Sequence, residues 1–207
     1  MKTRTGLILV GLVFFATTAM AQTTQTYNLS ATINPASSIG IAVNSVNSTG
    51  TPVYTPVAGT SLGFGTLTFN TGTNTYLASN YFTIDITAQG GAGSPDTQVK
   101  YIEGTGSQNP NGTTNGFGYK TSIQFTKEVA SGSTTTPTET QLAKFRLIDI
   151  TTAQHILYTQ VSPGWLRLYV GVCTGSTATD PTSCQAFTNS DATGTYQGQL
   201  QITATVH

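Results

Sequence analysis

Two segments of the chain alternate strictly between apolar and polar residues. In residues 27–34 the apolar row is Tyr27, Leu29, Ala31 and Ile33. At the C-terminus the row is Tyr196, Gly198, Leu200, Ile202, Ala204 and Val206, separated by Gln and Thr. A period of two places one row of side chains on a single face of an extended strand. Both segments are therefore predicted to be strands, and each needs a sheet, either in its own chain or in a neighbouring copy.

The rest of the chain repeats this pattern in shorter pieces. Val, Ile, Thr, Tyr and Phe dominate the apolar positions, and Gly, Pro, Asn or Ser interrupts them about every eight to twelve residues. Strands are expected near residues 39–43, 53–57, 62–69, 82–88, 99–101, 119–125, 145–149, 155–161 and 166–172, although residues 141–146 also fit one helical turn. No repeat of fixed period indicates a propeller or solenoid. We expect an all-β fold, an immunoglobulin-like Greek-key sandwich that is either complete or completed by a donor strand.

The first 21 residues are predicted to be an export signal. Lys2 and Arg4 precede an apolar run over residues 6–16, and Ala19-Met20-Ala21 fits a cleavage site. The run is shorter than the ~20 residues that span a bilayer, which argues against a retained anchor. The predicted organisation is a signal peptide at 1–21, an N-terminal extension at 22–38 and a sandwich domain at 39–207.

Charge is scarce in this chain. Charged residues make up 8%, against a typical ~25%. Without Lys2 and Arg4, six basic and eight acidic side chains remain, which argues against nucleic acid and against a polybasic membrane patch. A surface of neutral hydroxyls and amides suits copies that pack side by side, but it equally suits an ordinary secreted β-protein.

The two cysteines, Cys173 and Cys184, are predicted to form a disulfide. An export signal upstream makes this pairing the default, and the bridge would tie two neighbouring strands at their ends. The loop-entropy estimate for so short a loop is about 2–3 kcal/mol. A metal site is disfavoured because no His lies near the pair. The bridge favours the periplasm or the cell exterior.

Catalytic chemistry is not visible in the sequence. The histidines are His155 and His207, and the acidic residues are scattered singly. We expect His155 at the surface and Asp85 solvated on the face opposite Ile84. Trp165 and Tyr169 share a strand face and fit either a sugar platform or a cover over the edge of the core. We expect no enzyme activity, no metal and no cofactor.

The two ends and one internal motif resemble a known family. Leu62-Gly63-Phe64-Gly65 is similar to the Leu-x-Phe-Gly element early in spore-coat-U-like pilins. The last segment resembles the final strand of chaperone–usher pilins, in which a Gly commonly stands fourteenth from the end, as Gly194 does.

The resemblance implies a fimbrial subunit assembled by donor-strand exchange, with a role in adhesion or biofilm formation. Tyr27, Leu29, Ala31 and Ile33 would insert into the next copy. Gly194, Tyr196, Leu200, Ile202, Ala204 and Val206 would form the wall of the receiving groove. The implied partners are further copies, with a periplasmic chaperone and an outer-membrane usher, and the implied location is the cell surface. The alternative is a monomeric secreted module that binds carbohydrate or a host surface through residues 104–118 and Trp165.

The export signal gives a direct prediction. The mature protein, isolated from the medium or the periplasm, is expected to begin at Gln22. Intact-mass measurement and N-terminal sequencing check this, and a chain that retains Met1 would contradict it.

Overall fold

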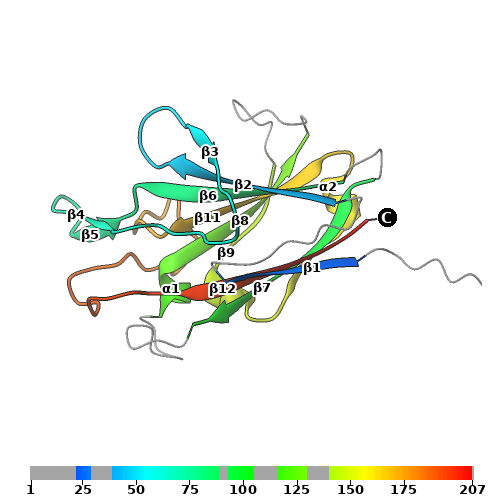
Figure 1. The fold of residues 1–207 in the computed structure, drawn as a ribbon. Helices are drawn as coiled ribbons and strands as arrows, with labels where there is room; N and C mark the ends of the chain where they lie inside the picture. Colours follow the sequence, from blue (N-terminus) through cyan, green and yellow to red (C-terminus); the bar gives the residue numbers. More distant parts are fainter. Residues whose placement is uncertain (1–21, 29–38, 89–92, 105–115, 130–139, 207) are drawn as a thin grey trace, which may run out of the picture.

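A computed structural model of the chain describes residues 22–28, 39–88, 93–104, 116–129 and 140–206 (Figure 1). Two antiparallel sheets pack face to face. The four-stranded sheet has the order β1 (Gln22–Asn28), β12 (Gly198–Val206), β7 (Pro95–Glu103) and β10 (Gln154–Ile156). The six-stranded sheet has the order β3 (Tyr54–Pro56), β2 (Ile39–Asn47), β6 (Asn80–Ala88), β11 (Trp165–Val172), β8 (Thr121–Glu128) and β9 (Thr140–Arg146). The expectation of an all-β sandwich is confirmed.

Smaller elements connect these strands. A hairpin of β4 (Thr68–Asn70) and β5 (Thr75–Leu77) projects from one end, and the short helices are α1 (Phe117–Lys120), the 3₁₀ turn η1 (Leu147–Ile150) and α2 (Tyr158–Val161). None of the helices in the described ranges is long and apolar enough to cross a membrane.

The core lies between the two sheets and is built by period-two rows. The six-stranded sheet buries Phe82, Ile84, Ile86, Ile123, Phe125, Leu166, Leu168 and Val170. The four-stranded sheet buries Val99, Tyr101, Leu200, Ile202 and Ala204 against them. Each row comes from alternate positions, because successive side chains of a strand point to opposite faces. The chain passes from sheet to sheet between β6 and β7, β7 and β8, β9 and β10, β10 and β11, and β11 and β12, which joins the two layers repeatedly.

Several local expectations were wrong. The strand expected over residues 155–161 ends at Ile156, and Tyr158–Val161 forms α2. The strand expected from Tyr119 begins only at Thr121, because Phe117–Lys120 forms α1. Residues 62–67 form no strand, although Leu62 and Phe64 are buried in the core; only Thr68–Asn70 pairs. The stretch 141–146 is part of β9 rather than a helical turn. The strand expected to continue through Leu147 to Asp149 instead ends at Arg146, where η1 begins. Leu62, Phe64 and Leu147 are buried from a loop or a 3₁₀ turn, and burial alone produces a sequence pattern like that of a strand.

The outer edges of the two sheets differ in character. β10 and β3 are three residues long, and β3 ends at Pro56, which has no N–H to donate. β9 carries Lys144 and Arg146, and its pairing with β8 shifts register between Phe125 and Thr126. Short length, proline, positive charge and bulges all hinder a further strand from joining an edge. The remaining edge strand, β1, has seven residues and no charged side chain.

The core makes a simple stability prediction. Replacing Leu168, which is fully buried in the central strand β11, by Ala is expected to lower the free energy of unfolding by about 2–5 kcal/mol. Val53→Ala, at a side chain that is 62% exposed, should change it by less than about 0.5 kcal/mol. Urea denaturation followed by fluorescence measures both, and equal midpoints would contradict the assignment of the core.

Candidate functional site

The N-terminal strand closes the edge of the four-stranded sheet. β1 runs antiparallel to β12 over seven register pairs, from Gln22 opposite Thr205 to Asn28 opposite Gln199 (Figure 1). Of the predicted inserting row, Tyr27 lies opposite Leu200, whereas Leu29, Ala31 and Ile33 lie outside the described residues. Among the described elements, β1 has extensive contacts with β12 and few with any other. This segment is thus held along one strand and at an edge, rather than inside the sheet.

The C-terminal strand is part of the core. Leu200, Ile202 and Ala204 are buried, and β12 lies between β1 and β7. Val206 ends the strand opposite Pro95. The wall of the predicted groove is therefore a real apolar row, and β1 is the strand that flanks it.

Two predicted members of this wall lie before the strand. Gly194 and Tyr196 belong to the preceding loop, because β12 begins at Gly198. Gly194 has a φ of 139°, a conformation that favours glycine and interrupts an extended run. The Tyr196 ring meets that of Phe187 edge to face at 4.8 Å, and its hydroxyl donates to the carbonyl of Ala192.

A second constellation lies on the outer face of the six-stranded sheet. Trp165, Arg167 and Tyr169 alternate with the core residues of β11 and so share this face, as the sequence predicts for Trp165 and Tyr169. Arg167 lies directly opposite Asp85 of β6, and two hydrogen bonds join them, Nε to Oδ1 at 2.7 Å and an Nη to Oδ2 at 2.9 Å. The side chains are only 1% and 13% exposed. The expectation that Asp85 is solvated was wrong, because the outer face is covered at this point.

Aromatic rings surround the Arg167 guanidinium. It lies 5.0 Å from the ring centre of Trp165, 5.5 Å from that of Tyr54 and 5.9 Å from that of Tyr169. Burial alone lowers the pKa of Arg167, but hydrogen bonds to Asp85 and Tyr169 outweigh it and raise the pKa above its usual value. Arg167 therefore stays charged, and its contacts fix the neighbouring rings. Trp165 is buried in this cluster and is not an exposed sugar platform.

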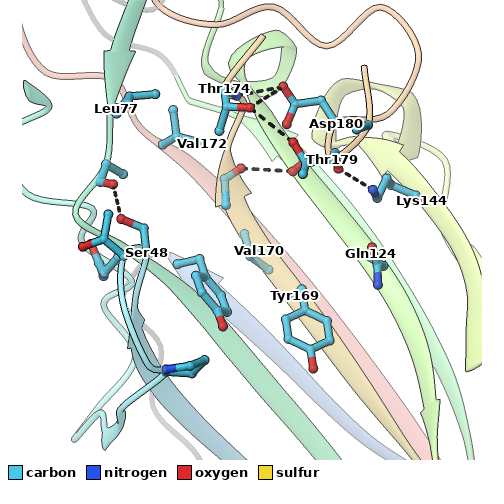
Figure 2. A pocket seen from close by; sticks show the side chains of 18 of the residues that line it. Ser48, Leu77, Gln124, Lys144, Tyr169, Val170, Val172, Thr174, Thr179 and Asp180 are labelled. Atoms are coloured by element: carbon cyan, nitrogen blue, oxygen red, sulfur yellow. Dashed lines mark hydrogen bonds between the residues drawn. The ribbon is translucent and has the colours of Figure 1, made fainter. Parts of the chain in front are cut away.

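Beyond this cluster the outer face opens into a hollow of about 990 Å³, which we call the outer hollow (Figure 2). Its floor contains Tyr81, Tyr169 and Gln124, one each from β6, β11 and β8. One wall is the segment 48–54, and the other is the segment 174–180 with Gln141 and Lys144 of β9. The sequence did not predict this site, apart from Tyr169, since the two walls lie more than eighty residues apart.

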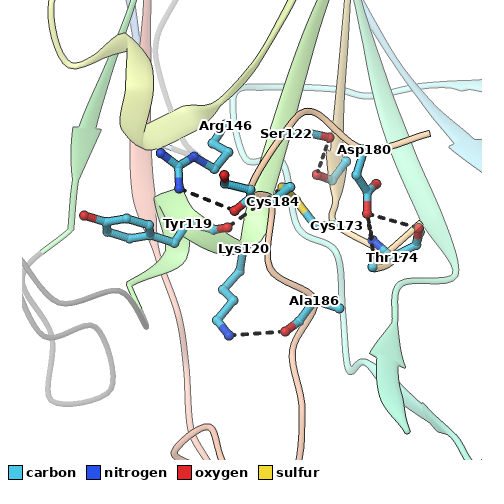
Figure 3. The surroundings of a disulfide bond; sticks show 12 residues. Tyr119, Lys120, Ser122, Arg146, Cys173, Thr174, Asp180, Cys184 and Ala186 are labelled. Carbon is cyan, nitrogen blue, oxygen red and sulfur yellow. Dashed lines mark hydrogen bonds between the residues drawn. A yellow bond between two sulfur atoms is a disulfide. The ribbon is translucent and has the colours of Figure 1, made fainter. Parts of the chain in front are cut away.

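The predicted disulfide between Cys173 and Cys184 is present, but it does not tie two strands (Figure 3). Cys173 follows β11, and Cys184 lies in the long loop before β12. Two backbone bonds place this loop against α1: Cys173 donates to the carbonyl of Lys120 at 2.8 Å, and Gln185 donates to that of Tyr119 at 3.1 Å. The bridge therefore fixes the loop that includes one wall of the outer hollow.

A buried ion pair fixes the same loop further along. Lys120 Nζ lies 2.9 Å from Asp191 and also donates to the carbonyl of Ala186 at 3.2 Å. Both side chains are nearly inaccessible to solvent. The loop between β11 and β12 is thus held at two separate points.

His155 lies at the surface, as the sequence predicts. His155 is in β10 at the surface, 46% exposed, with Nε2 3.7 Å from Asp96. Asp149 instead pairs with Arg146. Within the described ranges, no group of three His, Cys, Asp or Glu side chains could hold a metal ion.

The molecule is thus a disulfide-bonded antiparallel β-sandwich whose N-terminal strand closes one edge. No model of a known protein family, no curated protein and no solved structure matches the chain. The relation to pilins stays a prediction from the residues.

The Arg167–Asp85 pair makes a prediction about the outer face. Asp85→Ala leaves a buried cation without its partner and is expected to cost about 3–5 kcal/mol in unfolding free energy. The double change Asp85→Ala with Arg167→Met should recover much of this loss, because it removes the charge as well. Chemical denaturation of the four proteins of this double-mutant cycle measures the coupling, and additive losses would contradict it.

Proposed function

We propose that the protein is a structural subunit of an extracellular fibre, in which copies are joined by exchange of the N-terminal strand. Support comes from the predicted export signal, from the disulfide, and from the resemblance of the chain's ends to pilins. The arrangement of edges adds to this, because the edge at β1 is the long uncharged one. A periplasmic chaperone and an outer-membrane usher are the partners that such assembly would need.

The observation that carries the proposal is a match between two rows. In the described register, Tyr27, Gln25 and Thr23 stand opposite Leu200, Ile202 and Ala204, so only one of the three is a large hydrophobic residue. A shift of six residues would place Ile33, Ala31, Leu29 and Tyr27 opposite Leu200, Ile202, Ala204 and Val206, respectively. An even shift keeps every side chain on the same face of the strand. The apolar row of the extension thus has the spacing of the apolar row of β12.

The two registers differ in the apolar surface that they offer. Burying Tyr, Leu or Ile stabilises by about 1.5–3 kcal/mol each, whereas Gln and Thr contribute little of this kind. We propose that residues 22–28 cover β12 within the monomer and that residues 27–33 cover it in the fibre. Main-chain hydrogen bonds would supply the joint in either register, and the side chains would favour exchange.

Exchange of this kind produces an open assembly. The inserted segment and the receiving edge are different surfaces, so the contact is head to tail and does not close on itself. Each added copy offers one free extension and one edge to the next. The product is a filament on the cell surface.

The row match makes a discriminating prediction. Mature protein should give multimers that resist SDS without boiling, and Leu29→Asp or Ile33→Asp should abolish them, because each places a charge in the inserted row. Gln25→Asp, on the other register, should leave the multimers in place. Unboiled gel electrophoresis and negative-stain microscopy measure this. A single monomer band from the unaltered protein would sink the proposal, and so would a Leu29→Asp protein that still forms the ladder.

The competing function is a self-contained monomeric binding module. Deletion of residues 22–34 distinguishes this function from the fibre subunit. The fibre proposal predicts a folded protein that does not polymerise, with near-ultraviolet circular dichroism unchanged. Loss of the fold on deletion would favour the self-contained domain, because β1 would then be part of its core structure.

A further inference from the structure

We infer that the outer hollow is a binding site for a neutral oligosaccharide. Its volume of about 990 Å³ lies at the upper end of the range for small-molecule sites. Among the described residues that line it, none belongs to β1 or β12, so the hollow does not depend on strand exchange and would be present in monomer and fibre alike.

The floor supplies an aromatic surface. The rings of Tyr81 and Tyr169 have their centres 6.0 Å apart and are inclined at 43°, and Gln124 stands directly opposite Tyr169 on β8 (Figure 2). The negative face of an aromatic ring attracts the weakly positive C–H groups of a sugar face. Arg167, two residues before Tyr169 on the same face of β11, contacts this ring and holds it in place.

The walls are set in position before any ligand arrives. Asp180 Oδ2 accepts from the backbone N–H groups of Thr174, Gly175 and Ser176 at 2.8, 2.7 and 3.1 Å. On the other side, Ser48 donates through its hydroxyl to the carbonyl of Ala78 at 2.8 Å. Because these loops are already ordered in the free protein, less conformational entropy is lost when a ligand binds.

The charges of the hollow favour a neutral ligand. The carboxylate of Asp180 is used by the N–H groups of its own loop, and Lys144 Nζ donates to the carbonyl of Thr179. These two opposite charges balance within one wall. The amides of Gln124, Gln141 and Asn80, which both donate and accept hydrogen bonds, suit the hydroxyls of a sugar.

A peptide strand is a poorer fit than a sugar. The hollow lies on the face of the sheet, and its floor strands β6, β8 and β11 each have a paired neighbour on both sides. Their backbone groups are used in the sheet ladder, so an extended peptide would find no edge to join.

The test uses the full mature chain on an array of neutral and of sialylated or sulfated oligosaccharides. The expected result is binding to neutral members, with apparent affinity reduced about tenfold or more by Tyr169→Ala and less by Gln124→Ala. Tyr158→Ala is the matched control, since Tyr158 is an exposed tyrosine on α2, outside the hollow, and should bind as the unaltered protein does.

Hydrogen–deuterium exchange on the unaltered protein gives a second readout that does not depend on the variants folding. A bound neutral oligosaccharide should protect residues 48–54 and 174–180. The inference is overturned by an array without neutral binders, by binding confined to acidic glycans, by full affinity in folded Tyr169→Ala, or by protection elsewhere.

Discussion

The outer side of β12 is the position in this fold that another strand can cover. Its row Leu200, Ile202 and Ala204 is anchored in the core, so the strand cannot leave the sheet, while the backbone groups on its outer side require partners. β1 meets that requirement within the chain, using a segment in which Gln and Thr predominate. Because the requirement is one of backbone pairing, any extended segment with a compatible face can satisfy it. The proposed function follows from this substitution.

In the six-stranded sheet, the outer face also carries buried side chains, and these are charged or aromatic. Arg167 and Asp85 are desolvated there under aromatic rings, and the cost of this desolvation offsets much of their mutual attraction. The contact of Arg167 with Tyr169 fixes this ring in the floor of the outer hollow. The rigid floor and the disulfide-bonded wall would let the proposed site change little on binding. Loops held by Asp180 and by Cys173–Cys184 serve the same end.

Period-two patterns predicted β2, β6, β8, β11 and β12 because each has a buried row that selection for a core imposes directly. The same rule failed at Leu62 and Phe64, which are buried without a strand partner. It gave no indication of residues 22–26, since Gln-Thr-Thr-Gln-Thr has no apolar row, and only the structure gives their pairing with β12. Asp85 was misjudged because alternation tells which face a side chain takes, but not what covers that face. The outer hollow joins segments remote in sequence, and only the fold brings them together.

The unequal edges of the two sheets bear on the shape of any assembly. β3 ends at Pro56, which cannot donate a backbone hydrogen bond, and β10 is too short to pair extensively with a neighbouring strand. On β9, the charges of Lys144 and Arg146 and a register shift hinder pairing. Lateral sheet growth is therefore disfavoured at three of the four edges of the two main sheets in the described chain. In the proposed fibre, the edge at β1 would thus be the place where a sheet can extend, and fusion of threads through the other three edges would be disfavoured.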